Sequence, residues 1–329
     1  MVLVSLGTII LIFIISHILT PNPAVLWAGP KASASEVRAV AARYRLDDPL
    51  YVQFFYFMKD LLTGNWGIDP VNHLSVLSEI AMTLPNTLEL VFVSLLVVIV
   101  VGVGLGYVAA MRFSTKIDSM IRTAYILAWS TPTYLGAFLA VLVFSSMIPV
   151  FPSGGLYDPS IQLPPTVTGF SLIDSLIALN GRAFLSTLDH LLLPSLVLAF
   201  LNFGLISRAT RSSILSVRWS TYVKSARAKG LEEGEVRRRH VLRNALIDAT
   251  SLSALTFGWI LTGTVIVEEI FAWPGIGALA YNSFLDYPVL IPIVVVFTIG
   301  VILANFVADV LYSLLDPRIA MGRGTGAVG

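Results

Sequence analysis

Residues 84–110 read LPNTLELVFVSLLVVIVVGVGLGYVAA, and this stretch carries one charged side chain, Glu89. A helix needs about 20 predominantly apolar residues to cross the hydrocarbon core of a bilayer. Inside lipid, backbone amides must be bonded within the protein, so an isolated apolar segment of this length is expected to be helical. The stretch therefore predicts a membrane-spanning helix.

The composition of the whole chain points the same way. Of 329 residues, 56% are hydrophobic and 12% are charged, whereas soluble domains carry about 25% charged residues. The predicted fold class is therefore an all-α integral membrane protein with six transmembrane helices. The predicted spans are Val2–Leu19, Leu84–Ala110, Ile117–Met147, Leu188–Ile206, Ala245–Val267 and Val289–Leu315.

Positive charge predicts the orientation. Fifteen of the 21 Lys and Arg residues fall in three segments, 112–122, 208–243 and 318–323. Because cytoplasmic loops carry an excess of Lys and Arg, we expect this side to be the cytosol, with both termini cytosolic in a multi-pass protein of the cell membrane. Residues 16–21 are a poor signal-peptidase site, so residues 1–19 are interpreted as a retained span rather than a cleaved leader.

The spans divide the chain into an expected order of parts. Residues 20–83 form an extracytoplasmic segment with short helices near Ser33–Arg45 and Asp48–Leu62. Residues 84–315 form a five-helix core, which includes a Pro- and Gly-rich extracytoplasmic loop, 148–187, with a short helix near Ile173–Leu179. The core also includes a cytosolic loop, 207–245, and residues 316–329 form a cytosolic tail.

Within the cytosolic loop, residues 222–231 read YVKSARAKGL. Ser220 or Thr221 can begin a helix, and Gly230 suits the left-handed position after its end. Tyr222, Ala226 and Lys229 share a helical face, with Val223 beside them. Such a helix suits insertion into a groove of another protein. The alternative is an anchor on anionic headgroups, which fits Arg237–His240 better than a helix followed by a glycine bend.

The same loop resembles the coupling loop of ABC-transporter permease subunits, most of all those of the peptide and nickel importers. The general signature of that loop is Glu-Ala-Ala, three residues, then Gly; here Lys224-Ser225-Ala226 precede Gly230. The resemblance extends along nearly the whole chain. It includes Gly64-Asn65-Trp66-Gly67, Leu84–Leu90, Glu268, Phe271, Pro274–Gly277, Asn305, Asp309, Tyr312 and Asp316-Pro317-Arg318.

The resemblance implies a type I ABC importer permease fold and a transport subunit that is not itself an enzyme. The implied partners are a second related permease subunit, two ABC ATPase subunits that bind ATP and Mg, an extracytoplasmic solute-binding protein and the lipid bilayer. No cofactor is expected on this chain, and no nucleic acid. The implied cargo is short peptides, with oligosaccharides or metal complexes as alternatives. The implied ATPase-coupling residues are Tyr222, Val223, Ala226, Lys229, Gly230 and Leu231.

Several polar or glycine-containing positions could form the passage. Residues 245–267 are rich in hydroxyls, and Thr256, Thr262 and Thr264 are candidates for lining a route for a polar solute, with helix packing as the alternative. Trp273, Pro274 and Gly275 are candidates for an outer gate, with an interfacial aromatic belt as the alternative.

Other intramembrane features favour structural roles. Gly102 and Gly106 predict close helix packing. Asp309 is expected to form a structural ion pair with a basic residue of the cytosolic loop, and Glu89 to remain hydrated near the outer end of its span.

Two other function classes remain open from the sequence. An ion-gradient-driven secondary transporter would carry inverted repeats and broken helices, and no convincing repeat is found. A membrane-embedded enzyme would need a catalytic set, but Glu89, His17 and Asp309 are far apart in the sequence. No phosphate-binding Gly-x-x-x-x-Gly-Lys-Ser/Thr motif and no His–Glu metal motif occurs, so ATP hydrolysis is assigned to a partner and no metal site is expected.

Overall fold

The computed structural model describes residues 2–19, 22–29, 32–284 and 286–315, and these residues form helices and connecting loops without a named strand. The first half comprises α1 (Val2–Phe13), the π-helix η1 (Ile14–Leu19), α2 (Pro23–Ala28), α3 (Ala34–Arg43), α4 (Leu50–Thr63), α5 (Val76–Met111), α6 (Lys116–Ser130), α7 (Thr133–Val141) and the π-helix η2 (Leu142–Met147). The second half comprises α8 (Ser171–Ile177), α9 (Gly181–Arg218), α10 (Thr221–Ala228), α11 (Glu233–Glu235), the π-helix η3 (Val236–Leu242), α12 (Arg243–Ile270), α13 (Ile276–Asn282) and α14 (Tyr287–Leu315).

Four helices are long and apolar enough to cross a membrane: Val76–Met111, Gly181–Arg218, Leu252–Ile270 and Tyr287–Leu311. They contain the whole of the predicted second and fourth spans and most of the fifth and sixth. The predicted first span corresponds to a shorter apolar helix, Leu6–Ile18. The described residues therefore contain four such spans, or five if the bent third one is counted.

The third predicted span, Ile117–Met147, is not one straight helix. It is divided into α6 and the α7–η2 segment, which are bent by 104° relative to each other. Thr131 has an extended backbone (φ −84°, ψ 121°) immediately before Pro132. The ring of a proline disfavours helical geometry at the preceding residue, which explains why α6 ends there.

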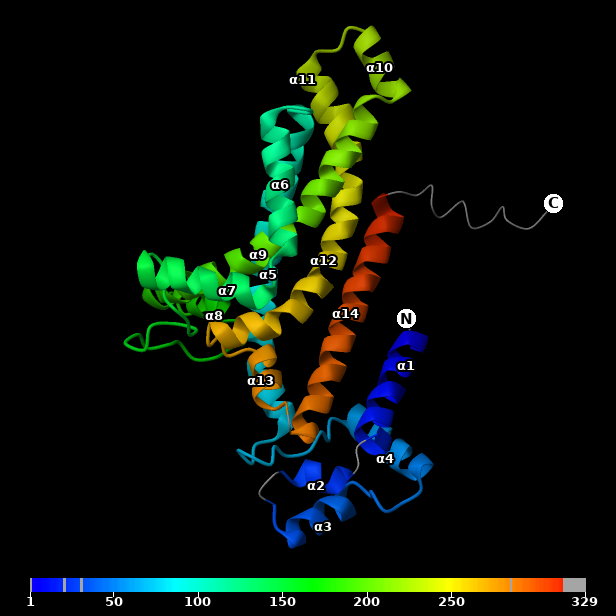
Figure 1. The fold of residues 1–329 in the computed structure, drawn as a ribbon, viewed down its shortest axis with the longest axis vertical. Helices are drawn as coiled ribbons and strands as arrows, with labels where there is room; N and C mark the ends of the chain where they lie inside the picture. The colour runs from blue at the N-terminus through cyan, green and yellow to red at the C-terminus, as the bar shows by residue number, and fades with distance from the viewer. Residues whose placement is uncertain (1, 20–21, 30–31, 285, 316–329) are drawn as a thin grey trace, which may run out of the picture. The chain divides into compact units, whose positions relative to one another are not determined.

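The chain divides into two compact units, each assembled from distant segments. Unit 1 comprises Met1–Glu89, Gly154–Leu188 and Glu268–Ile302, and unit 2 comprises Leu90–Ser153, Asp189–Val267 and Leu303–Gly329. In unit 1, α13 packs its Ile276 and Ala280 against Val76 and Ile80 of α5 and Val289 of α14. In unit 2, α10 and α11 lie beyond the adjacent ends of α9 and α12 (Figure 1).

The short helices expected outside the membrane are present as α3, α4 and α8. Ser33 and Glu36 form a complete capping box at the start of α3, and Gly64 ends α4 in a left-handed conformation with φ 74°. The helices α2 and α13 were not predicted. They have six and seven residues, respectively.

Candidate functional site

The predicted helix of the cytosolic loop is α10, and Gly230 follows its end as expected. Gly230 has φ +82°, a left-handed value that side chains other than glycine rarely adopt. Its N–H donates to the carbonyl of Arg227 at 3.0 Å. Ser220 occupies the N-cap position, but its hydroxyl donates to the Val217 carbonyl at 2.7 Å and does not cap the helix.

The face of α10 that was expected to dock includes two residues that face inward. Val223 is fully buried and Ala226 is 6% exposed, in a core with Ala110, Ile214 and Val236. Tyr222, Lys229, Gly230 and Leu231 remain exposed. The expectation that Val223 and Ala226 form part of an exposed docking face is therefore wrong. Val236 and Val241, which come later in the chain, help to cover them. The spacing of residues on one helix cannot reveal such a contact.

The core beneath α10 includes apolar residues that flank the basic run. Val236 is fully buried and Val241 is 2% exposed, and both lie in η3. A π-helix joins residues five positions apart, which is the spacing of these two valines. The sequence analysis interpreted Arg237–His240 only as an anchor, and the flanking valines were the missed signal.

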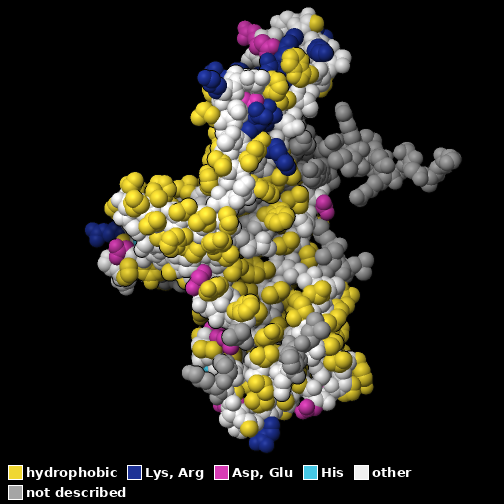
Figure 2. All heavy atoms as spheres, in the orientation of Figure 1, with side chains coloured by type: hydrophobic (Ala, Val, Ile, Leu, Met, Phe, Trp, Pro, Cys, Tyr) yellow, Lys and Arg dark blue, Asp and Glu magenta, His cyan; other side chains and the backbone are white. Residues whose placement is uncertain are grey.

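Polar contacts also join α10 to the two short helices that follow it, α11 and η3. Arg227 Nε donates to Glu233 Oε1 at 2.5 Å, which lowers the pKa of Glu233 below its usual value. The hydroxyl of Tyr222 donates to the carbonyl of His240 at 3.2 Å. Figure 2 shows Lys and Arg side chains gathered over this end of unit 2. The helices α10, α11 and η3 therefore form a basic, internally packed end of unit 2, which we call the α10 tip.

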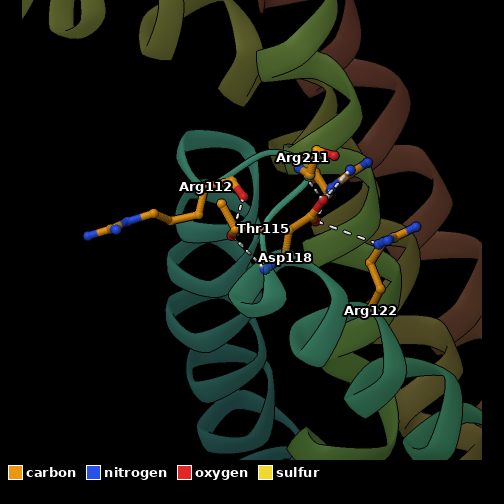
Figure 3. A network of polar contacts seen from close by, with 6 residues as sticks. Arg112, Thr115, Asp118, Arg122 and Arg211 are labelled. Atoms are coloured by element: carbon orange, nitrogen blue, oxygen red, sulfur yellow. Dashed lines mark hydrogen bonds and ion pairs between the residues drawn. The ribbon is translucent and has the colours of Figure 1, made fainter.

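A buried carboxylate ties α6 to α9 about two turns before α9 ends. Asp118 is 1% exposed and receives two hydrogen bonds from Arg211, Nε to Oδ1 at 2.7 Å and Nη2 to Oδ2 at 2.9 Å. The backbone N–H of Ser114 donates to Oδ2 at 3.1 Å, and Arg122 Nε lies 3.7 Å from Oδ1 (Figure 3). The sequence analysis did not select Asp118. An acidic residue within the basic segment 112–122 was the available signal.

Glycines bring α5 and α9 into close contact within unit 2. A Cβ placed on Gly102 would lie 2.8 Å from the Cβ of Ile206, and one on Gly106 would lie 2.5 Å from the carbonyl oxygen of Ser207. The predicted packing role of these glycines is confirmed, with α9 of the same chain as the partner.

In unit 1, the candidate gate residues are held against the first half of α5, at Asn86 and Thr87. Trp273 is fully buried, and its Nε1 donates to the carbonyl of Asn86 at 3.0 Å. In return, Asn86 Nδ2 donates to the carbonyl of Pro274 at 2.8 Å. Because Trp273 is buried in protein, the interfacial-belt interpretation does not hold for this side chain.

Glu268 completes this contact and is fully buried. The hydroxyl of Thr87 donates to Oε1 of Glu268 at 2.7 Å and accepts from the N–H of Ile276 at 2.8 Å. The N–H of Ala278 donates to Oε2 of Glu268 at 3.0 Å. A Cβ on Gly275 would lie 2.3 Å from Glu268 Oε2 and 2.4 Å from Thr87 Oγ1, so only glycine fits there. We call Asn86, Thr87, Glu268 and residues 272–277 the outer latch.

Two further buried carboxylates of unit 1, one on α5 and one on α8, accept hydrogen bonds from the backbone of residues 167–172. Glu89 is 5% exposed and accepts from the N–H of Leu172 at 2.8 Å, so the expectation that it stays hydrated is wrong. Asp174 accepts from the N–H groups of Val167, Thr168 and Gly169 at 2.8–3.2 Å. Burial acts to raise the pKa of Asp174, but these bonds and the Thr168 hydroxyl outweigh it and hold the pKa below its usual value.

The candidate pathway residues of α12 do not share one surface. Thr256 and Thr264 are buried within unit 2, whereas Thr262 is exposed. Each hydroxyl donates to a carbonyl of its own helix: Thr256 to Leu252, Thr262 to Trp259 and Thr264 to Leu261. Only Thr262 therefore presents surface to a solute, while the other two contribute to packing.

Two further expectations concern ion pairs and metals. Asp309 on α14 is exposed and forms no ion pair with another described residue, so the structure does not contain the expected pair. The side chain of Tyr312 and residues 316–318, which carry part of the resemblance, lie outside the described residues. Within the described ranges, no three His, Asp or Glu side chains are grouped so that they could hold a metal ion.

Comparison with known proteins adds a family and several relatives. The sequence pattern of the family described as binding-protein-dependent transport system inner membrane component matches residues 102–321. The probable D,D-dipeptide transport system permease protein DdpB of Escherichia coli (strain K12) is 37% identical over 326 residues, which cover 98% of this chain and 96% of that protein. The di/tripeptide transport system permease DppB of Pseudomonas aeruginosa is 34% identical over 320 residues, covering 96% and 95%. The oligopeptide transport system permease AppB of Bacillus subtilis is 33% identical over 319 residues, with the same coverage.

Proposed function

The chain belongs to the family of binding-protein-dependent transport system inner membrane components, and from this membership we propose that it forms half of an ATP-driven import pathway for short peptides. Membership makes it a multi-pass transport component of the cytoplasmic membrane rather than an enzyme. It also implies ATPase and solute-binding partners. The peptide cargo is supported by the dipeptide, di/tripeptide and oligopeptide systems in which its relatives act. Oligosaccharides and metal complexes remain the alternative cargoes.

The proposed assembly contains a second, related permease subunit and two ATPase subunits, which bind ATP and Mg. In this arrangement both termini and α10 face the cytosol. The excess of Lys and Arg in segments 112–122 and 208–243 supports this orientation. The translocation pathway would form where the two permease subunits meet, with Thr262 as a candidate lining residue.

The observation that carries the proposal is the construction of the α10 tip. Val223 and Ala226 anchor α10 in a core shared with α5, α9, η3 and α12. An ATPase subunit that displaces the exposed side of α10 would therefore move the ends of those helices as well. This coupling of a cytosolic site to transmembrane helices is a two-state transition of the kind used in ligand-driven switches.

The outer latch is the proposed extracytoplasmic gate of the same pathway. Its hydrogen bonds join Asn86 and Thr87 of α5 to the end of α12 and the loop after it, so opening would require the Thr87–Glu268 and Asn86–Pro274 contacts to separate. Because buried polar groups are costly when they lose their partners, the closed arrangement is stabilised until the transport cycle supplies a compensating interaction.

A bulky residue at position 230 tests the coupling. No atom lies within 4 Å of a Cβ built on Gly230, so Gly230→Trp adds bulk to the exposed tip and strains its left-handed backbone. We expect peptide uptake to be abolished while membrane insertion is unchanged. Gly29→Trp is the matched control, because Gly29 also has a positive φ (+93°) and open space but lies outside the loop. Normal uptake by the Gly230 variant would contradict the coupling role.

The rival from another class is a secondary transporter. It requires that the chain alone accumulate substrate under a proton or sodium gradient. We expect no such uptake by the purified chain in proteoliposomes, and uptake only when the ATPase subunits and ATP are present. Gradient-driven uptake by the chain alone would replace the proposal.

A further inference from the structure

The helices α6 and α9 run antiparallel in unit 2, and two contacts fix their register. Asp118 on α6 binds Arg211 on α9, and Tyr125 on α6 touches Gly204 on α9, where an added Cβ would lie 2.8 Å from the Tyr125 Cβ. The two contacts are seven residues apart on each helix. Arg122 and Arg208 therefore lie at nearly the same level, between the two contacts.

A cavity of about 180 Å³ lies between the same two helices. Its walls are formed by Tyr125, Ile126 and Trp129 of α6 and by Leu205 and Arg208 of α9. Trp129 is 65% exposed and Ile126 is 58% exposed, so the groove presents a large apolar surface. Residues three and four apart lie on the same side of a helix, which places Arg122 one turn from Tyr125 and Ile126. The groove is thus basic at one end and apolar along its length.

The basic end carries uncompensated charge. Arg208 is exposed and forms no ion pair with any residue in the described part of the chain. Arg122 is 3.7 Å from Asp118, but both oxygens of that carboxylate already accept closer hydrogen bonds from Arg211. Figure 3 shows Arg122 and Arg211 approaching Asp118 from different sides, whereas Arg112 extends away from it. Arg208 therefore lines the groove without a partner carboxylate, and Arg122, at nearly the same level, shares with Arg211 a carboxylate whose two oxygens already accept closer bonds.

The position of Arg208 along α9 suggests what the groove binds. The predominantly apolar part of α9 continues to Ile206, and Arg208 follows after Ser207. Cations at the end of an apolar span lie at the level of the lipid headgroups, and basic pockets between membrane helices bind anionic headgroups. We propose that this groove is a binding site for an anionic phospholipid. The phosphate lies between Arg122 and Arg208, and an acyl chain lies along Ile126 and Trp129.

The full chain in lipid nanodiscs allows a direct test through Trp129. Acyl chains carrying bromine quench a tryptophan that they touch, so brominated phosphatidylglycerol is compared with brominated phosphatidylcholine at equal mole fraction. We expect stronger quenching by the anionic lipid, and loss of that excess in Trp129→Phe. Each of Arg122→Gln and Arg208→Gln should lower the preference for the anionic lipid about fivefold, because a basic residue near a charged membrane surface contributes about that factor.

The controls separate this site from general attraction to charge. Arg112→Gln removes one exposed charge from the neighbouring turn and should leave the preference unchanged. Arg208→Lys keeps the positive charge and should retain most of the preference for the anionic lipid. The proposal is overturned if no excess quenching occurs, or if the excess survives in the Arg122→Gln/Arg208→Gln double variant.

Two other occupants give different outcomes. Inorganic phosphate added at millimolar concentration should leave the excess quenching unchanged; displacement by phosphate would reassign the site to a soluble anion. In the assembled transporter the excess should persist. Its loss, together with cross-linking of position 129 to a second permease subunit, would reassign the groove to a protein interface.

Discussion

Thr87 and Glu268 are 181 positions apart in the sequence, and the hydroxyl of Thr87 donates a 2.7 Å hydrogen bond to Oε1 of Glu268. The same hydroxyl accepts a bond from the N–H of Ile276. One side chain in the first half of α5 therefore holds both the end of α12 and the start of α13. This arrangement makes Thr87 the most informative position for testing the outer latch.

Thr87→Val keeps the shape of the side chain but removes both hydrogen bonds. Leaving buried polar partners unsatisfied costs about 1–3 kcal/mol per group, so we expect the latch to open more often. The chain has no cysteine, so an Ala280→Cys background provides a single probe, and Ala280 is 8% exposed. Labelling by a membrane-impermeant maleimide should accelerate in Thr87→Val and stay slow in Thr87→Ser. Equal rates in all three proteins would exclude this role.

Ala272→Gly should act in the opposite direction. Ala272 has φ 46°, a left-handed backbone that costs about 1–3 kcal/mol for a residue other than glycine. Glycine removes this strain and stabilises the closed latch. We expect slower labelling of the same Ala280→Cys probe and slower peptide uptake. Ala178→Gly, at the ordinary helical φ of −79°, is the control. Faster uptake in Ala272→Gly would show that the strain does not oppose closure.

We expect a substitution of Asp118 or Arg211 alone to lower the stability of the protein more than substitution of both residues does. Removing one partner of a buried ion pair leaves the other charge uncompensated, which costs about 3–5 kcal/mol. Asp118→Asn and Arg211→Gln should each lower the thermal stability of the purified chain, and the double variant should recover most of it. Arg122→Gln removes only the 3.7 Å partner and should have little effect. Additive losses in the double variant would show that the two residues do not act as a pair.

The exposed and buried sides of α10 should respond differently to truncation. Val223→Ala removes two buried carbon atoms, leaves a cavity in the core of the tip and should destabilise it by about 2 kcal/mol. Leu231→Ala removes a partly exposed side chain (37%) and should leave stability unchanged while weakening ATPase binding. Thermal unfolding and co-purification of the ATPase subunits measure the two effects. Full ATPase retention by Leu231→Ala would place the docking surface elsewhere.

The loop held by Asp174 should depend on pH. Since the folded pKa of Asp174 is depressed, its stabilising effect is fully present above the unfolded value of about 3.9 and is lost as the pH falls through the folded pKa. Cleavage of residues 154–170 by pepsin should therefore increase as the pH is lowered below about 3.9. Asp174→Asn cannot ionise, so its cleavage should already be fast at the upper end of that range. Parallel profiles for both proteins would argue against this role of Asp174.

The sequence alone was sufficient to predict the all-helical fold class, the main apolar spans and the glycine that follows the end of α10. Those features depend on local composition, on the length needed to cross a bilayer and on one backbone conformation that favours glycine. The bend between α6 and α7 was also readable from Pro132, although the prediction of one straight span overlooked it. The family resemblance rested on ordered motifs, and the comparisons confirmed it.

Which side of a helix is covered could be decided only by the folded chain. Val223 and Ala226 share a face with residues that remain exposed, and their burial depends on Val236 and Val241 returning over them. Likewise, the sequence around Glu89 and Trp273 suggests a hydrated or interfacial boundary, but a helix distant in the sequence packs against each side chain. The physical reason is that burial and hydrogen-bond partners come from residues tens to hundreds of positions away. A local sequence pattern indicates which interactions a side chain is able to make, and the tertiary structure determines which residues it contacts.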